Sequence, residues 1–224
     1  MNKIKMEKFI KFLTKFKSRS RHHSKLTNFI VPELSKIKGA NILEFGVSEK
    51  CMSTELFLNY CNFKECKLFS IDVIDYSQKF KNNKWKFIKA RDDNFKYVKS
   101  YIPKSIDLIL LDTIHEAKHV EKILYYYYDF LNINSCFFID DISWLPYLKD
   151  ADKNRFYAEI NNHETFIKLL EIYNNNKLNF NIEFTFEGTG ICKIIKLNNN
   201  KLNQPKKINS RNFSIKNILR KIVR

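Results

Sequence analysis

Apolar residues along the chain occur either as short continuous runs or at helical spacing. Short runs of the kind that form buried strands occupy residues 41–45, 67–71, 85–90, 106–111 and 136–139. Spacing typical of amphipathic helices occurs at about residues 53–61, 96–101 and 116–131, after a helical lead-in over 25–38. Strands that alternate with helices in this way predict an α/β domain with a parallel sheet.

The last part of this pattern predicts a different connection. A long helix is expected over 154–173, followed by strands over 181–186 and 191–197. The link between these two strands, Glu187 to Gly190, is short and contains glycine, so the pair is interpreted as an antiparallel hairpin. The predicted fold is therefore a doubly wound, mostly parallel sheet of seven strands with a C-terminal antiparallel hairpin.

Charge divides the chain into three parts. The formal net charge is +16, but residues 1–25 hold nine Lys or Arg against one acid, and residues 201–224 hold eight against none. The residues between them carry 23 basic and 23 acidic side chains. We therefore expect a basic amphipathic N-terminal segment (1–25), a balanced central domain (26–197), and a linker with a basic amphipathic C-terminal helix (198–224).

The basic ends also bear on partners and location. Neither contains the ~20 consecutive apolar residues of a membrane span, so a cytoplasmic protein is predicted. Basic amphipathic segments bind anionic membrane surfaces, which would place the protein at the inner face of the membrane; a solvated end or a contact between homo-oligomer subunits is the alternative. The balanced core argues against nucleic acid. The five cysteines form no CxxC pair and are interpreted as reduced structural thiols.

Acidic side chains and a histidine follow two of the predicted strands. Asp112 and His115 come after the strand at 106–111, and Asp140 and Asp141 come after the strand at 136–139. Neighbouring parallel strands would bring these groups to one edge of the sheet. Three carboxylates with no Lys or Arg between them in the sequence repel one another unless a cation intervenes, and a hard divalent ion such as Mg²⁺ takes oxygen ligands of this kind. Taken singly, such an Asp is more often a helix N-cap.

A second set of candidate residues surrounds the first predicted strand. Glu44 and Gly46 form an acid-x-Gly turn, Ser48 follows in a small-residue position, and Asp72 ends the second strand. This arrangement resembles the class I S-adenosylmethionine-dependent methyltransferases over about residues 40–197. The resemblance implies S-adenosylmethionine as cofactor, held by Glu44, Gly46, Ser48 and Asp72, with Asp92 near the adenine. Of the glycines usual in that turn, only Gly46 is present.

The acidic cluster extends the resemblance. Asp112-Thr-Ile-His115 and the pair Asp140-Asp141 are similar to motifs of metal-dependent sugar O-methyltransferases of the macrocin O-methyltransferase type, and to a broader bacterial Asp-x-x-His group. The resemblance implies that Asp112, Asp140 and Asp141 bind Mg²⁺ and that His115 is the general base. Trp144, Pro146 and Tyr147 could then wall a sugar pocket, or simply form a packed loop.

Methyl transfer to an alcohol requires removal of the hydroxyl proton, and imidazole is suited to accept it near neutral pH. The expected activity is therefore O-methylation of a sugar or another small hydroxylated acceptor, in synthesis of a cell-surface glycan. Two alternatives stay open: an RNA or protein methyltransferase that uses the basic ends, and a non-catalytic binding module of the same fold.

Overall fold

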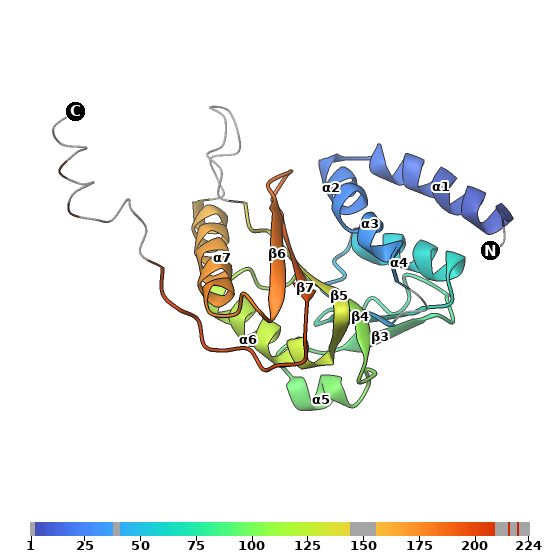
Figure 1. The fold of residues 1–224 in the computed structure, drawn as a ribbon. Helices are drawn as coiled ribbons and strands as arrows, with labels where there is room; N and C mark the ends of the chain where they lie inside the picture. Colours follow the sequence, from blue (N-terminus) through green and yellow to red (C-terminus); the bar gives the residue numbers. More distant parts are fainter. Residues whose placement is uncertain (1–2, 38–40, 144–155, 209–214, 216–218, 220–224) are drawn as a thin grey trace.

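The computed structural model describes residues 3–37, 41–143 and 156–208, and the isolated positions 215 and 219. One seven-stranded sheet has the order β3-β2-β1-β4-β5-β7-β6 (Figure 1). The strands are β1 (Asn41–Phe45), β2 (Lys67–Asp72), β3 (Trp85–Lys89), β4 (Ile106–Leu111), β5 (Leu131–Asp140), β6 (Phe180–Thr185) and β7 (Ile191–Lys196). β1 to β5 pair in parallel, and β7 runs antiparallel to both its neighbours. The predicted doubly wound sheet with a terminal hairpin is confirmed.

The helices cover both faces of this sheet. They are α1 (Lys3–Lys17), α2 (Arg21–Phe29), α3 (Val31–Leu34), α4 (Met52–Phe63), α5 (Phe95–Lys99), α6 (Ala117–Tyr127) and α7 (Phe156–Asn174). The helix predicted over 116–131, between β4 and β5, was wrong in its boundaries. α6 ends at Tyr127, and a 3₁₀ turn leads into β5 at Leu131. Leu131 pairs with Ile106, and the register then shifts before Cys136 pairs with Leu108. The intervening irregular, partly exposed segment breaks the apolar pattern that marks a buried strand.

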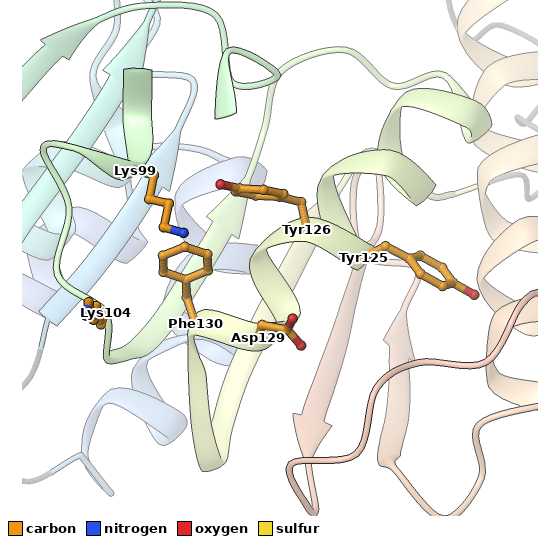
Figure 2. A pocket seen from close by; sticks show the side chains of 6 residues that line it. All are labelled: Lys99, Lys104, Tyr125, Tyr126, Asp129 and Phe130. Carbon is orange, nitrogen blue, oxygen red and sulfur yellow. The ribbon is translucent and has the colours of Figure 1, made fainter. Parts of the chain in front are cut away.

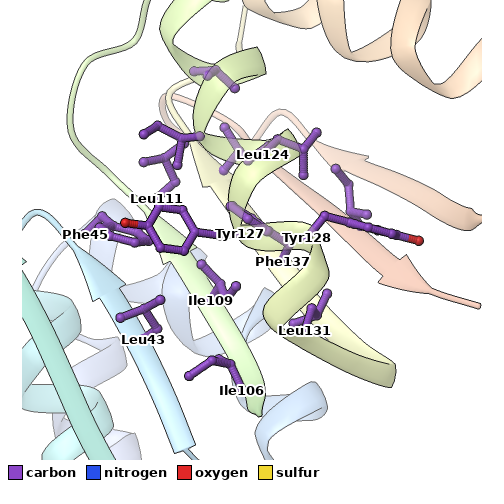
Figure 3. Close-up of a cluster of buried hydrophobic side chains, with 14 of the residues drawn as sticks. Leu43, Phe45, Ile106, Ile109, Leu111, Leu124, Tyr127, Tyr128, Leu131 and Phe137 are labelled. Atoms are coloured by element: carbon purple, nitrogen blue, oxygen red, sulfur yellow. The ribbon is translucent and has the colours of Figure 1, made fainter. Parts of the chain in front are cut away.

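Side chains that alternate along the strands form two apolar clusters, one on each face of the sheet. Leu43 and Phe45 of β1 belong to the cluster that α5, α6 and α7 cover, in which the Tyr127 ring lies 4.6 Å from that of Phe45 (Figure 3). Ile42, on the opposite face, belongs to the cluster beneath α1 to α4. Burial on both faces explains why the central strands read as continuous apolar runs.

The N-terminal helices are part of the second cluster. Phe9 and Phe16 of α1 are buried, and the Phe9 ring stacks on Phe63 of α4 at 5.0 Å. Leu26 and Ile30 are buried as well. Some apolar positions of the basic N-terminal segment therefore face the domain, whereas Ile4 and Ile10 are exposed. This packing fixes α2 beside the carboxyl edge of the sheet (Figure 1).

The segment after β7 lies along α7 instead of extending away from the domain. The backbone N–H of Lys206 donates to the Glu171 carbonyl at 3.0 Å, and Asn203 hydrogen-bonds to Asn175 and Asn176. Of the predicted C-terminal helix, the structure describes only the isolated positions 215 and 219, both of them helical. The predicted sugar-wall residues Trp144, Pro146 and Tyr147 fall outside the described residues. Among the helices of the described residues, none is long and apolar enough to cross a membrane.

Candidate active site

The carboxyl ends of β4 and β5 bring the predicted acidic groups and the histidine together. Leu111 and Ile139 are paired residues at these ends, which confirms that the two strands are neighbours. The His115 Nε2 atom lies 3.4 Å from Oδ2 of Asp141 and 3.7 Å from Oδ1 of Asp112. The imidazole is 27% exposed, so a proton could pass between it and a ligand or solvent.

Backbone contacts hold these residues in place. The N–H of Asp112 donates to the Phe45 carbonyl at 2.8 Å, which joins the ends of β4 and β1. The Thr165 hydroxyl of α7 donates to the His115 carbonyl at 3.2 Å. Asp141 has a φ of +55°, a left-handed conformation that Asp adopts more readily than most residues. From this position, directly after β5, the Asp141 carboxylate contacts the imidazole.

A buried lysine completes the cluster, and the sequence interpretation did not include it. The Lys25 ammonium of α2 forms a very short ion pair with Oδ1 of Asp140. It also donates to the Thr189 hydroxyl at 2.8 Å and to the Gly190 carbonyl at 3.4 Å. Its side chain is 1% exposed. The sequence showed only a basic N-terminal segment; no local pattern distinguishes this lysine from its solvated neighbours.

The cluster shifts the ionisation of Asp112. Burial raises its pKa, the charges of Asp140 and Asp141 raise it further, and Lys25 opposes the shift. Because 39% of the Asp112 side chain is exposed, solvent screens these charges.

The carboxylates do not form a ready divalent-ion site in this arrangement. Within the described ranges, no three or more His, Cys, Asp and Glu side chains are placed to hold a metal. Asp140 is directed to Lys25, whereas Asp112 and Asp141 face His115. The three acids therefore do not fit a shared Mg²⁺ ion while Lys25 stays in place, and their assignment as metal ligands stays a prediction.

The predicted cofactor turn follows β1 on the same edge. Gly46 has a φ of +91°, and a Cβ built there would lie 1.9 Å from the Asp112 carbonyl oxygen. Glycine is therefore required by the close approach of β4, not only by the needs of a ligand. Asp72 accepts hydrogen bonds from the N–H groups of Val47 at 2.8 Å and Ser48 at 3.4 Å. Asp72 thus fixes the turn on which the cofactor is predicted to lie.

Two other predicted cofactor residues have their carboxyl groups inside the protein. Glu44 is fully buried and accepts hydrogen bonds from Thr54 at 2.9 Å and Ser70 at 2.6 Å. Asp92 is 5% exposed and interacts with His119 at 2.8 Å and Thr113 at 2.5 Å. Burial works to raise the pKa of Asp92, but the bonds from His119 and Thr113 lower it overall. Cofactor contacts by both residues stay predictions.

One hollow lies at this edge of the sheet, and a second, larger one lies away from it. A cavity of about 20 Å³, room for one water molecule, lies between α2, the start of α4 and the acids. Its walls include His22, Lys25, Leu26, Ser48, Met52, Ser53, Asp112 and Asp140. A larger, open hollow of about 400 Å³ is lined by Lys99, Lys104, Tyr125, Tyr126, Asp129 and Phe130 (Figure 2). The larger one lies beside the amino ends of β4 and β5, opposite the candidate site.

Comparison with solved structures identifies the fold. No protein-family model and no curated protein sequence matches the chain. The MycE methyltransferase of the mycinamycin biosynthetic pathway, in complex with Mg, SAH and mycinamycin VI, superposes with a TM-score of 0.61 at 13% identity. SAH-bound PaMTH1 of Podospora anserina superposes at 0.60 and 12% identity, over 85% of this chain and 88% of PaMTH1. This chain has the class I methyltransferase fold.

A putative caffeoyl-CoA O-methyltransferase of Staphylococcus aureus is also similar, with a TM-score of 0.56, 15% identity, and coverage of 88% of this chain and 93% of that protein. The superposition on MycE covers 86% of this chain and 56% of MycE, so the present chain spans about half of the MycE length. At these identities the likeness describes the fold alone.

Proposed function

We propose that this protein is an S-adenosylmethionine-dependent methyltransferase that methylates a hydroxyl group of a sugar or another small acceptor. The position of the His115 imidazole, between two carboxylates and at the edge where β1 and β4 meet, carries this proposal. The class I methyltransferase fold supports it, because structural neighbours were solved with SAH bound.

The chemistry calls for a base at this place. In the reaction the acceptor oxygen forms a bond to a methyl carbon, the methyl–sulfur bond breaks, and its electron pair stays on sulfur. An alcohol is a poor nucleophile until it loses its proton, and His115 would accept that proton. Asp141, 3.4 Å from Nε2, would then stabilise the imidazolium that forms, and Asp112, at 3.7 Å, would add to this effect when it is ionised.

The predicted cofactor turn has features that suit a bound donor. Gly46 presents no side chain, and Asp72 anchors the amides of the turn through Val47 and Ser48. Gly46, Ser48 and Asp72 would line the donor, whose sulfonium supplies the methyl group. The cavity of about 20 Å³ beside Ser48 is far smaller than a nucleoside, so donor binding requires α2 or the turn to move.

Mg²⁺ was predicted as a second cofactor from the three acids, and MycE was solved with Mg. Because Lys25 is bound to Asp140, none of the steps proposed here uses a metal ion. Methyl transfer with and without EDTA decides whether this part of the sequence prediction is correct.

Two measurements test the proposed function. Calorimetry with S-adenosylmethionine should give saturable binding; no binding, with or without Mg²⁺, would favour the non-catalytic module. Transfer of labelled methyl groups should then be screened over nucleotide sugars and lipid-linked saccharides. His115→Ala should lower the rate by about 10²- to 10⁴-fold, the usual contribution of a general base. The matched control is His23→Ala, which removes a histidine of α2 that contacts Ser20 instead of the acids.

A further inference from the structure

We propose that the Lys25 ammonium is the resident cation of the acidic site and occupies the place at Asp140 that a divalent metal ion would otherwise take. This inference concerns cation binding and does not require methyl transfer. One consequence, that catalysis proceeds without an added divalent ion, rests on the proposed function.

The Lys25 ammonium lies in a site built from two parts of the fold. It donates to Asp140 at the end of β5, and to Thr189 and the Gly190 carbonyl in the β6–β7 turn. An ammonium has three N–H donors, and three acceptors surround this one. The side chain is 1% exposed. A buried, fully hydrogen-bonded lysine of this kind is a fixed part of the structure, unlike the solvated lysines of the same segment.

The bonding of Asp140 explains why a metal would compete with Lys25. Oδ1 of Asp140 accepts from the ammonium and also from the Asp141 N–H, at 2.8 Å. A carboxylate oxygen has two lone pairs, and both are used here. A divalent ion that reached this oxygen would have to displace one donor, and it would be repelled by the buried positive charge beside it.

The lysine also attaches the N-terminal helices to the site. Asn28, one turn further along α2, donates to Glu187 of the β6–β7 turn at 3.3 Å. Ser143, just after β5, donates its N–H to the Thr189 carbonyl at 2.8 Å. Lys25 therefore joins α2 to both chain segments that position Asp140.

Mn²⁺ is a suitable probe, because its free concentration can be measured by electron paramagnetic resonance. We expect the full-length wild-type protein to bind Mn²⁺ no more tightly than about 1 mM at this cluster. Lys25→Met should free Asp140 and tighten Mn²⁺ binding by at least about ten-fold. Adding Asp112→Asn to that variant should remove the gain.

Lys196→Met is the matched control. Lys196 is also a buried lysine, but it donates to the Tyr128 carbonyl at 3.0 Å and the Leu131 carbonyl at 2.8 Å, away from the acidic cluster. Its replacement removes a buried ammonium without freeing a carboxylate and should leave Mn²⁺ binding unchanged. Equal gains in both variants would overturn the proposal, since they would show that loss of any buried lysine opens a binding site.

Wild-type protein decides the matter if Lys25→Met does not fold. Saturable Mn²⁺ binding in the micromolar range that disappears in Asp112→Asn would overturn the proposal, because the acids would then bind a metal with Lys25 present. Failure to find an acceptor would count against the proposed function alone. If an acceptor is found and EDTA abolishes its methylation, the methyltransferase function stands and the Lys25 proposal fails.

Discussion

The buried carboxyl group of Glu44 should make the stability of the protein depend on pH. This carboxyl group is fully buried, Oε2 accepts two hydroxyl hydrogen bonds, and Oε1 has no hydrogen-bond partner within the described part of the chain. Burial raises the pKa of Glu44 to about 7 from the usual 4.5, against the lowering effect of Ser53, Ser70 and Thr54. An unpartnered oxygen costs less in a neutral carboxylic acid than in a carboxylate, which agrees with this direction.

The sign of the pH dependence follows from proton uptake. Between pH 4.5 and about 7 the folded protein holds a proton on Glu44 that the unfolded chain has released. Stability from this group is therefore greatest at low pH and is lost as pH rises through 7. A shift from 4.5 to about 7 corresponds to about 3 kcal/mol at full ionisation, and to roughly 2 to 3 kcal/mol between about pH 5 and pH 8.

Glu44→Gln removes this ionisation and keeps the shape of the side chain. Urea unfolding followed by circular dichroism at several pH values should show the variant gaining roughly 2 to 3 kcal/mol relative to wild type as pH rises from about 5 to 8. Glu65→Gln is the control, because the Glu65 side chain is 87% exposed and its replacement should give a difference that is flat with pH. A flat difference for Glu44→Gln, with a ¹³C-detected pKa near 4.5, would refute the reasoning.

Three further substitutions test the scaffold of the site. Gly46→Ala should destabilise the protein by at least about 2 kcal/mol in urea unfolding, against about 1 kcal/mol for Gly188→Ala, whose added Cβ meets no atom within 4 Å. Asp72→Ala should lose about 1 to 3 kcal/mol of stability and weaken S-adenosylmethionine binding in calorimetry; unchanged affinity would show that the turn does not bind the donor. Thr165→Val should cost about 1 kcal/mol of stability, yet slow methyl transfer without changing donor affinity, if His115 is the base.

The sequence predicted the sheet because its strands are buried on both faces. The runs at 41–45, 67–71 and 106–111 match β1, β2 and β4 closely, and their order along the chain leaves few topologies. The start of β5 was missed since Asn132 to Ser135 interrupts the apolar run, with Asn134 at a φ of +64°. A strand that begins with exposed residues lacks the apolar run and the regular alternation that predict a strand, so its start is not recognised from the sequence.

The sequence predicted only those contacts of the site that follow from which strands are neighbours in the sheet. Asp112 and Asp141 meet His115 because β4 and β5 are neighbours, and this follows from the fold. The ion pair of Asp140 does not follow from the order of the strands, because its partner Lys25 is 115 residues away in the chain and reaches the site only through the packing of α2. Counting charges between the acids in sequence therefore missed the cation that is nearest to them in space.

Five of the acids at the carboxyl edge relieve their charge in different ways, and this difference indicates where an acceptor can approach. Backbone amides bind Asp72, an ammonium binds Asp140, and burial favours the neutral form of Glu44. Of these five, only Asp112 and Asp141 combine an imidazole partner with side chains that are 39% and 31% exposed. A hydroxyl that approaches the Nε2 atom of His115 therefore lies close to these two carboxylates, at the ends of β4 and β5. An acceptor with several hydroxyl groups could donate to both carboxylates while one oxygen loses its proton, which favours a sugar over an acceptor with a single hydroxyl.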